Sequence, residues 1–214
     1  MTGCEVGTEL TACLRINAYY IFIHPYFPVL PPPLVPQSPD RPTFTNIQAS
    51  QLNPSNLPIG SRSPLALALS ALLVLIPPSD HKHAAEETSM ALRREYAELY
   101  SRFALLTLEN GLESIPAAES DQHQADPGSW SSLHANVPLI MEPVLALALL
   151  GVYEYAHRGN VAKMRSRVNH ALTTAMDLGL HLHSGGEAAA ECLDAQRRAW
   201  WLTVSTISLL RCLC

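Results

Sequence analysis

The chain has 214 residues, a length that predicts one domain or slightly more at roughly 100–200 residues per domain. Hydrophobic residues make up 48% of the chain, which is enough to bury a core, and charged residues only 15%. Fourteen basic and nineteen acidic side chains give a net charge of −5. This balance argues against a nucleic-acid-binding surface in the chain itself, because phosphate binding requires clustered Lys and Arg.

No targeting or membrane-spanning segment is expected. The N-terminus lacks a basic region followed by an apolar core, which a signal peptide requires. The longest apolar stretches are residues 65–76, residues 144–152 and the tail from Ala199. A membrane span needs about 20 apolar residues. We interpret all three stretches as buried helix, with a tail anchor as the alternative for the last one.

The cysteines indicate free thiols and no metal site in this chain. Their spacing forms neither a CxxC pair nor the quartet of ligands that a structural zinc site needs. An odd number without a secretion signal favours a reducing compartment. The five are Cys4, Cys13, Cys192, Cys212 and Cys214.

Residues 1–13 form a leader without a clear pattern, and residues 14–64 form a Pro-rich front. The apolar stretch 10–24 predicts a short helix, with a strand as the alternative. Pro25 disfavours the helical conformation at His24 and so ends that element. Residues 25–64 contain eleven of the 17 prolines, including the triplet 31–33 that favours polyproline II. We expect an extended connector across the domain surface; the alternative is a ligand for an SH3-type domain.

Two helices are expected within residues 65–110. Ser63 as N-cap with Pro64 in the first position predicts a helix over 65–76, which is apolar on all sides and therefore buried. A second helix is predicted over 86–110, with acids in its first turn and Asn110-Gly111 as its end. Its apolar face is expected to consist of Leu92, Tyr96, Leu99, Phe103 and Leu106.

A polar loop over 111–138 separates these helices from a helical hairpin. The hairpin consists of helices over 144–157 and 161–178, and the turn at Gly159-Asn160 is so short that antiparallel packing is expected. Asn160 caps the second helix and Gly179 ends it. The inner face of that helix is expected to consist of Val161, Met164, Val168, Leu172, Ala175 and Leu178.

A last helix is expected to begin near Ala188 and to turn inward Leu193, Trp200, Val204 and Ile207. Together, the elements predict an all-α fold: an irregular bundle of antiparallel helical hairpins with a Pro-rich, extended N-terminal segment.

Three segments of the chain resemble one known family. Residues 177–181 read DLGLH, residues 197–201 read RRAWW, and residues 19–30 contain His24-Pro25 followed by an aromatic, Phe27, and Pro28. In this order and spacing the three resemble the fungal-specific transcription factor regulatory domain, the middle homology region of binuclear zinc-cluster transcription factors. The resemblance covers about residues 14–204, which with the remaining tail makes 14–214 a partial regulatory domain.

The resemblance implies regulation of RNA polymerase II transcription in a fungal nucleus. In the family, six clustered cysteines bind two zinc ions and read DNA; this chain has no such cluster. Zinc and DNA contacts would therefore belong to an element that lies upstream or has been lost, and no cofactor is expected in this chain. After Trp201 the family continues with an aromatic and an acid–Arg pair, where this sequence has Val204, Ile207 and Ser208. The domain is therefore expected to be truncated.

The resemblance also implies protein partners or a small-molecule inducer, and a dimer in the full-length protein. The alternative functions are a helical protein-interaction module, or a truncated gene product without function and without DNA binding.

No catalytic, cofactor-binding or metal-binding residues are assigned, and the chain is not expected to be an enzyme. It contains no nucleophile elbow, phosphate loop or His-Glu-x-x-His motif. The two His-x-His pairs, at 81–83 and 181–183, are interpreted as polar loops, with metal binding as the alternative. The basic residues Arg158, Lys163, Arg165 and Arg167 are interpreted as a solvated helix face.

The tryptophan pair is interpreted as structural, with a ligand or corepressor surface around it as the alternative. Adjacent residues point about 100° apart on a helix, so Trp200 and Trp201 can both be buried only where neighbours surround that helix. We expect both to be buried. Arg197 is expected to stack on one of the rings or to pair with Glu191 or Asp194.

Overall fold

The computed structural model describes residues 18–33, 63–77, 86–112, 132–182 and 190–212. Within these ranges the chain is helical and contains no strand, so the predicted all-α fold class is confirmed. The helices are α2 (Pro64–Leu73), α3 (Glu87–Leu112), α4 (Glu142–Ala156), α5 (Val161–Asp177) and α6 (Ala190–Cys212), with a short 3-10 turn, η4 (Leu139–Met141), before α4. The predictions for 1–17, 34–62 and 113–131 lie outside the described residues.

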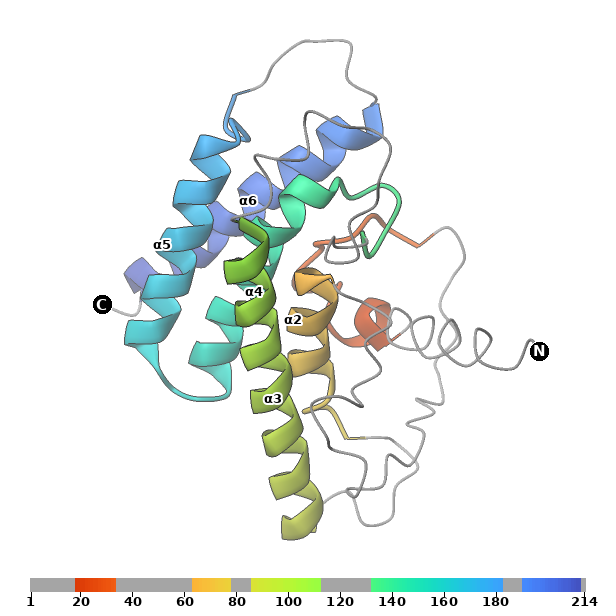
Figure 1. Ribbon diagram of the computed structural model, residues 1–214, viewed down its shortest axis with the longest axis vertical. Helices are drawn as coiled ribbons and strands as arrows, with labels where there is room; N and C mark the ends of the chain where they lie inside the picture. The colour runs from red at the N-terminus through yellow and green to blue at the C-terminus, as the bar shows by residue number, and fades with distance from the viewer. Residues whose placement is uncertain (1–17, 34–62, 78–85, 113–131, 183–189, 213–214) are drawn as a thin grey trace, which may run out of the picture.

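Helix α4 is the centre of the fold. Every residue of α4 from Glu142 to Glu154 is buried, because α2 packs on one side of it and α5 and α6 on the other (Figure 1). Among the described residues, the segment Leu139–Ala156 is long and apolar enough to cross a membrane, but 78% of it is buried inside the structure. That burial is typical of a core helix. The interpretation of residues 144–152 as buried helix therefore agrees with the structure.

Helix α2 begins as its sequence predicts. The Ser63 side chain accepts a hydrogen bond from the backbone N–H of Ala66, at 3.0 Å, and Pro64 occupies the first helical position. The helix ends at Leu73, three residues before the predicted end. A tighter turn continues the chain to Ile76, whose N–H bonds to the carbonyl of Leu73.

The predicted apolar face of α3 is wrong in part. Leu106 is 51% exposed, and Leu92, Leu99 and Phe103 are only half-buried. The side that packs inward combines two tyrosines with alanine and serine residues, so a pattern of large apolar residues identifies only part of it. The buried residues are Tyr96, Ala97, Tyr100, Ser101, Ala104 and Leu108. The helix also runs through Asn110-Gly111 to Leu112, two residues beyond the predicted end.

Helices α4 and α5 are joined by the predicted turn and pack closely against each other. Gly159 adopts φ = 61°, which glycine adopts without strain, and the side chain of Asn160 accepts from the N–H of Lys163 at 2.9 Å. At the crossing, a Cβ on Gly151 would lie 2.6 Å from a methyl group of Val168. Glycine therefore sets how closely these two helices approach.

The predicted inner face of α6 is wrong in its rotation. Leu193, Trp200, Val204 and Ile207 are half-buried, and Trp201 is 62% exposed. The side of the helix that packs inward is instead lined by small and hydroxyl side chains, whose hydroxyl groups bond to carbonyls one turn earlier. Its buried residues are Ala195, Ala199, Leu202, Thr203, Thr206 and Leu210. The tail from Ala199 is therefore a helix with one buried side.

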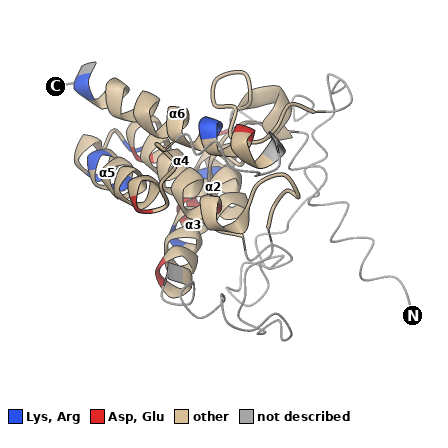
Figure 2. Ribbon diagram, turned by 90° about the horizontal axis from the view of Figure 1, so that it is seen from above, with Lys and Arg blue, Asp and Glu red and all other residues tan. Residues whose placement is uncertain are grey.

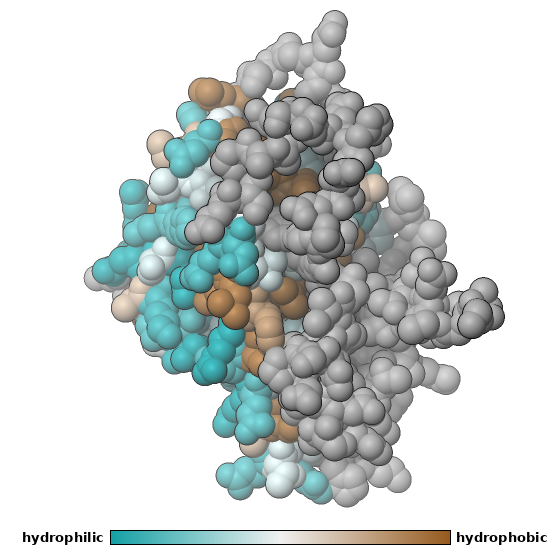
Figure 3. All heavy atoms as spheres, viewed as in Figure 1, coloured by the Kyte–Doolittle hydropathy of each residue, from teal (hydrophilic) through white to brown (hydrophobic). Residues whose placement is uncertain are grey.

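The outer surface is polar over α5 and apolar in scattered places. Lys163 and Arg165 are exposed, as the interpretation of a solvated helix face requires, but Arg167 is half-buried with its Nε buried, and Arg158 forms ion pairs with Glu98 and Glu154. Figure 2 shows where the basic residues lie along α5. Figure 3 shows hydrophilic residues over much of the described surface in that view, with apolar side chains reaching it between them. Tyr26 and Trp201 are the most exposed large apolar side chains among the described residues.

Candidate functional site

The three segments that carry the family resemblance all contribute to the main hydrophobic core. Tyr19 of the front, Leu180 of the chain after α5 and Ala199 of α6 are all buried in the same core cluster. Trp200 is partly buried against that cluster. Segments separated by as many as 180 residues therefore form one packed unit.

The front segment is organised around the hydroxyl group of Tyr19. Residues 18–22 are helical, and a turn at 23–26 then reverses the chain. The Tyr19 oxygen accepts from the N–H of Leu30 at 3.0 Å, donates to the carbonyl of Phe27 at 3.0 Å, and lies 3.0 Å from Nδ1 of His24. Because the hydroxyl has one hydrogen, this arrangement is satisfied when neutral His24 carries its proton on Nδ1. Burial raises the pKa of Tyr19 far above its usual value, although the hydrogen bond from Leu30 opposes the shift.

The DLGLH segment ends α5 with a Schellman motif. Gly179 adopts φ = 66°, its N–H bonds to the carbonyl of Met176, and the N–H of Leu180 bonds to the carbonyl of Ala175. The motif buries Leu180 and brings the ring of His181 to 5.7 Å from that of Trp200. The glycine of this motif is thus required by the turn.

Arg198 is the central charged residue of this region. Its side chain is only 14% exposed, and all three guanidinium nitrogens are buried without a hydrogen-bond acceptor of suitable geometry. Among the described residues it forms an ion pair with Asp194, Nη1 to Oδ2 at 3.2 Å, and the Asp194 side chain is 58% exposed. The predicted pairing of Arg197 with Asp194 is therefore wrong: the neighbouring arginine makes it, and Arg197 is exposed.

The charge of Arg198 acts on several histidine and tyrosine side chains. Burial, and then the positive charge of Arg198, lower the pKa of His24 and of His134 below the usual 6.5. Burial raises the pKa of Tyr20, and Arg198 opposes that shift. Tyr20 donates its hydroxyl hydrogen to the carbonyl of Pro31 at 2.7 Å. We call Tyr19, Tyr20, His24, His134 and Arg198 the arginine cluster.

A buried carboxylate lies at the start of α4. Glu142 is fully buried, accepts from the Ser63 hydroxyl at 2.5 Å, and accepts from the backbone N–H of Leu133 at 2.6 Å. Burial raises its pKa above the usual 4.5, and the hydrogen bonds from Ser63, Leu133 and Ser132 oppose the shift. Its oxygens are occupied by donors from two other segments, so this acid holds the fold together.

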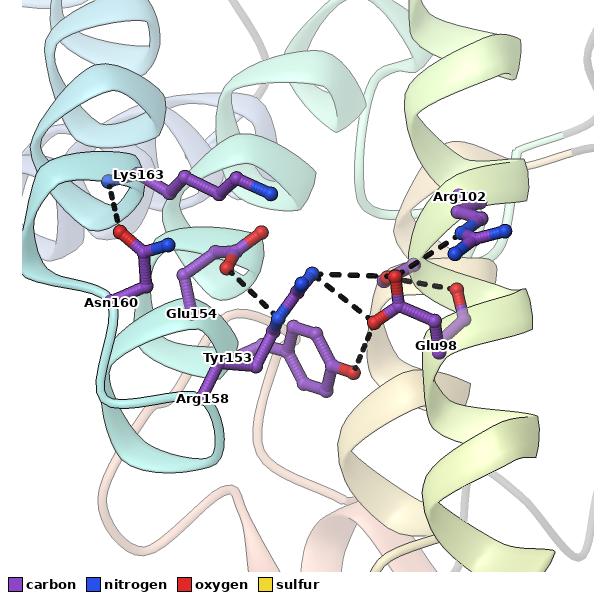
Figure 4. A network of polar contacts seen from close by, with 8 residues as sticks. Glu98, Arg102, Tyr153, Glu154, Arg158, Asn160 and Lys163 are labelled. Carbon is purple, nitrogen blue, oxygen red and sulfur yellow. Dashed lines mark hydrogen bonds and ion pairs between the residues drawn. The ribbon is translucent and has the colours of Figure 1, made fainter.

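A second polar network joins α3 to the end of α4 (Figure 4). Arg158 lies 3.1 Å from Glu98 and 3.5 Å from Glu154, and Arg102 lies 3.1 Å from the other oxygen of Glu98. The Tyr153 hydroxyl donates to Glu98 at 3.4 Å, and burial raises the pKa of Tyr153 to about 12. The acids and arginines compensate one another, so this network is a structural contact between helices.

The described residues contain no group of three or more His, Cys, Asp or Glu side chains that could hold a metal ion. The pair at 81–83 and the second histidine of 181–183 lie outside the described residues. Cys192 is a free, half-buried thiol.

The sequence analysis assigned no site residues, and it gave an expected role to Arg197 and none to Arg198. The structure separates them, because Arg198 lies beside Ala195, Ala199 and Leu202 on α6 whereas Arg197 points to solvent. The run of small residues at every fourth position, Ala195 and Ala199, was the signal that could have identified the buried side. His134 gave no signal, because it lies far from the other members in sequence.

No family model, no curated protein and no solved structure matches the chain in comparisons with known proteins.

Proposed function

We propose that the chain is a regulatory domain of a fungal zinc-cluster transcription factor, acting in the nucleus on transcription by RNA polymerase II. One observation supports the proposal more than any other. The segments that resemble the family, within 19–30, 177–181 and 197–201, share one core; His181 lies against Trp200, and the charge of Arg198 acts on Tyr20 and His24.

The physical roles of these residues also agree with the proposal. Gly179 is fixed by its positive φ, Tyr19 by three polar contacts, and Trp200 by its position between His181 and the core. A domain built in this way changes activity through contacts with a partner or a small molecule. DNA is read by a zinc cluster outside this chain, and the domain itself carries no catalytic role.

Fusing the chain to an unrelated DNA-binding domain in yeast tests the proposal directly. We expect the fusion to change expression of a reporter severalfold, up or down, relative to the DNA-binding domain alone. Trp200→Ala should abolish the change, since it removes the ring that joins two of the segments, whereas Trp201→Ala should retain it. Immunoblots would establish equal protein levels. A nuclear, well-expressed fusion that leaves the reporter unchanged would contradict a regulatory role and favour the alternative of a helical interaction module.

Sequencing the native transcript with its genomic flanks provides a separate test. We expect six closely spaced cysteines in frame upstream. A transcript with no such cluster in any isoform would exclude DNA binding in the family's manner.

A further inference from the structure

We propose that Arg198 binds the carboxylate or phosphate group of a small organic anion, within the arginine cluster. The guanidinium carries five N–H donors on three nitrogens that are all buried. Leaving a charge of this kind buried and unpaired costs several kcal/mol. Arg198 lies at the junction of three segments. A bound anion would supply the hydrogen-bond acceptors that its guanidinium lacks.

Asp194 does not meet this need. It contacts one nitrogen at 3.2 Å, without hydrogen-bond geometry, and its side chain is 58% exposed. Because the Asp194 carboxylate is largely exposed, solvent weakens this ion pair. Most of the guanidinium, including Nε and Nη2, therefore remains without an acceptor in the described part of the chain.

The other members of the arginine cluster fit an anion and not a cation. Tyrosine and histidine side chains carry no negative charge near neutral pH, so Tyr19, Tyr20, His24 and His134 do not repel an anion. A planar carboxylate can accept two parallel N–H bonds from arginine, and a phosphate oxygen pair can do the same.

This inference deepens the proposed function, since its biological meaning, an anionic inducer, rests on the regulatory role. The binding itself does not depend on that role. A binding assay on the purified chain and the reporter assay can therefore fail independently of each other.

Thermal unfolding in phosphate and in succinate tests the proposal, with sodium chloride keeping the ionic strength constant. We expect at least one of the two anions to raise Tm by a few degrees at about ten times its Kd. The stronger of the two identifies the chemistry of the bound group. Arg197→Gln, which removes the same charge one residue away, should retain the shift, and Arg198→Gln should lose it.

The anion-free baseline separates binding from a purely structural role. Arg198→Gln should there be as stable as the wild-type chain or more stable, because it removes an unpaired buried charge. A variant that loses stability equally with and without anion, or one that retains the anion-dependent shift, overturns the proposal.

A measurement on the wild-type chain decides the case if Arg198→Gln fails to fold. A bound anion compensates the positive charge of Arg198 and should therefore raise the pKa of His24 and of His134. NMR of the histidine ring protons measures both pKa values. Equal pKa values for both histidines in saturating phosphate, in succinate and in chloride would overturn the proposal.

Discussion

Replacing Gly151 by alanine tests the closeness of the α4–α5 crossing. The new Cβ would lie 2.6 Å from Cγ2 of Val168, well inside van der Waals contact. Valine in a helix has essentially one rotamer, so the methyl group cannot rotate away. Overpacking of this kind costs about 1–3 kcal/mol. The same substitution gains about 1 kcal/mol of helix propensity, so the net loss is about 0–2 kcal/mol.

The sign of the effect should reverse when the clash is removed. In a Val168→Ala background, Gly151→Ala meets the Met164 carbonyl at 3.6 Å and the Arg167 Cβ at 3.8 Å, which are ordinary contacts. It should then stabilise by up to about 1 kcal/mol. Urea unfolding of the two single variants, the double variant and the wild-type chain gives a coupling energy, expected to be about 1–3 kcal/mol. A coupling energy near zero would refute the close crossing.

Three further predictions concern the tryptophans, the buried acid and the cap of α5. Trp200→Ala should cost about 3 kcal/mol in urea unfolding because its ring packs on the core. Trp201→Ala should change stability by less than about 0.5 kcal/mol because its ring is exposed. Equal losses would contradict the observed orientation of α6, which turns Trp200 and not Trp201 toward the core. The folded chain binds the Glu142 proton more tightly than the unfolded chain, since burial raises the pKa above 4.5. The free energy of unfolding of the wild-type chain should therefore fall relative to that of Glu142→Gln as pH rises from 4.5 through the raised pKa. If urea titrations give the same difference between the two proteins across this pH range, the prediction is wrong. Asn160→Ala should lower the free energy of unfolding by about 1 kcal/mol, and Asn160→Asp should preserve it. Equal stability of Asn160→Ala and the wild-type chain in urea unfolding would show that the cap contributes nothing.

The helix boundaries were largely predictable because capping is a local property. Ser63, Asn160 and Gly179 act within a few residues of themselves, so their sequence context is enough. The buried sides of α3 and α6 were not predictable in the same way. Closely packed helices bury small residues such as Ala97 and Ala199, and a pattern of large apolar residues then gives the wrong rotation.

The arginine cluster could not be predicted because its members come from three separate segments of the chain. Only the fold brings His24, His134 and Arg198 together. The burial of Glu142 could not be predicted either, because an acid before Pro143 is typical of an exposed first helical turn. Its donors, Ser63 and Leu133, become known only from the tertiary structure.

The hydrogen bond between Ser63 and Glu142 also makes the fold tolerant of changes in length. It ties the beginnings of α2 and α4 together across 79 positions of sequence and so closes a long loop that contains α3. The entropy cost of closing such a loop grows only with the logarithm of its length, so ten extra residues between α3 and α4 would add about 0.1 kcal/mol. Relatives of this chain can therefore differ greatly in length between these two helices while keeping the same junction of helix starts.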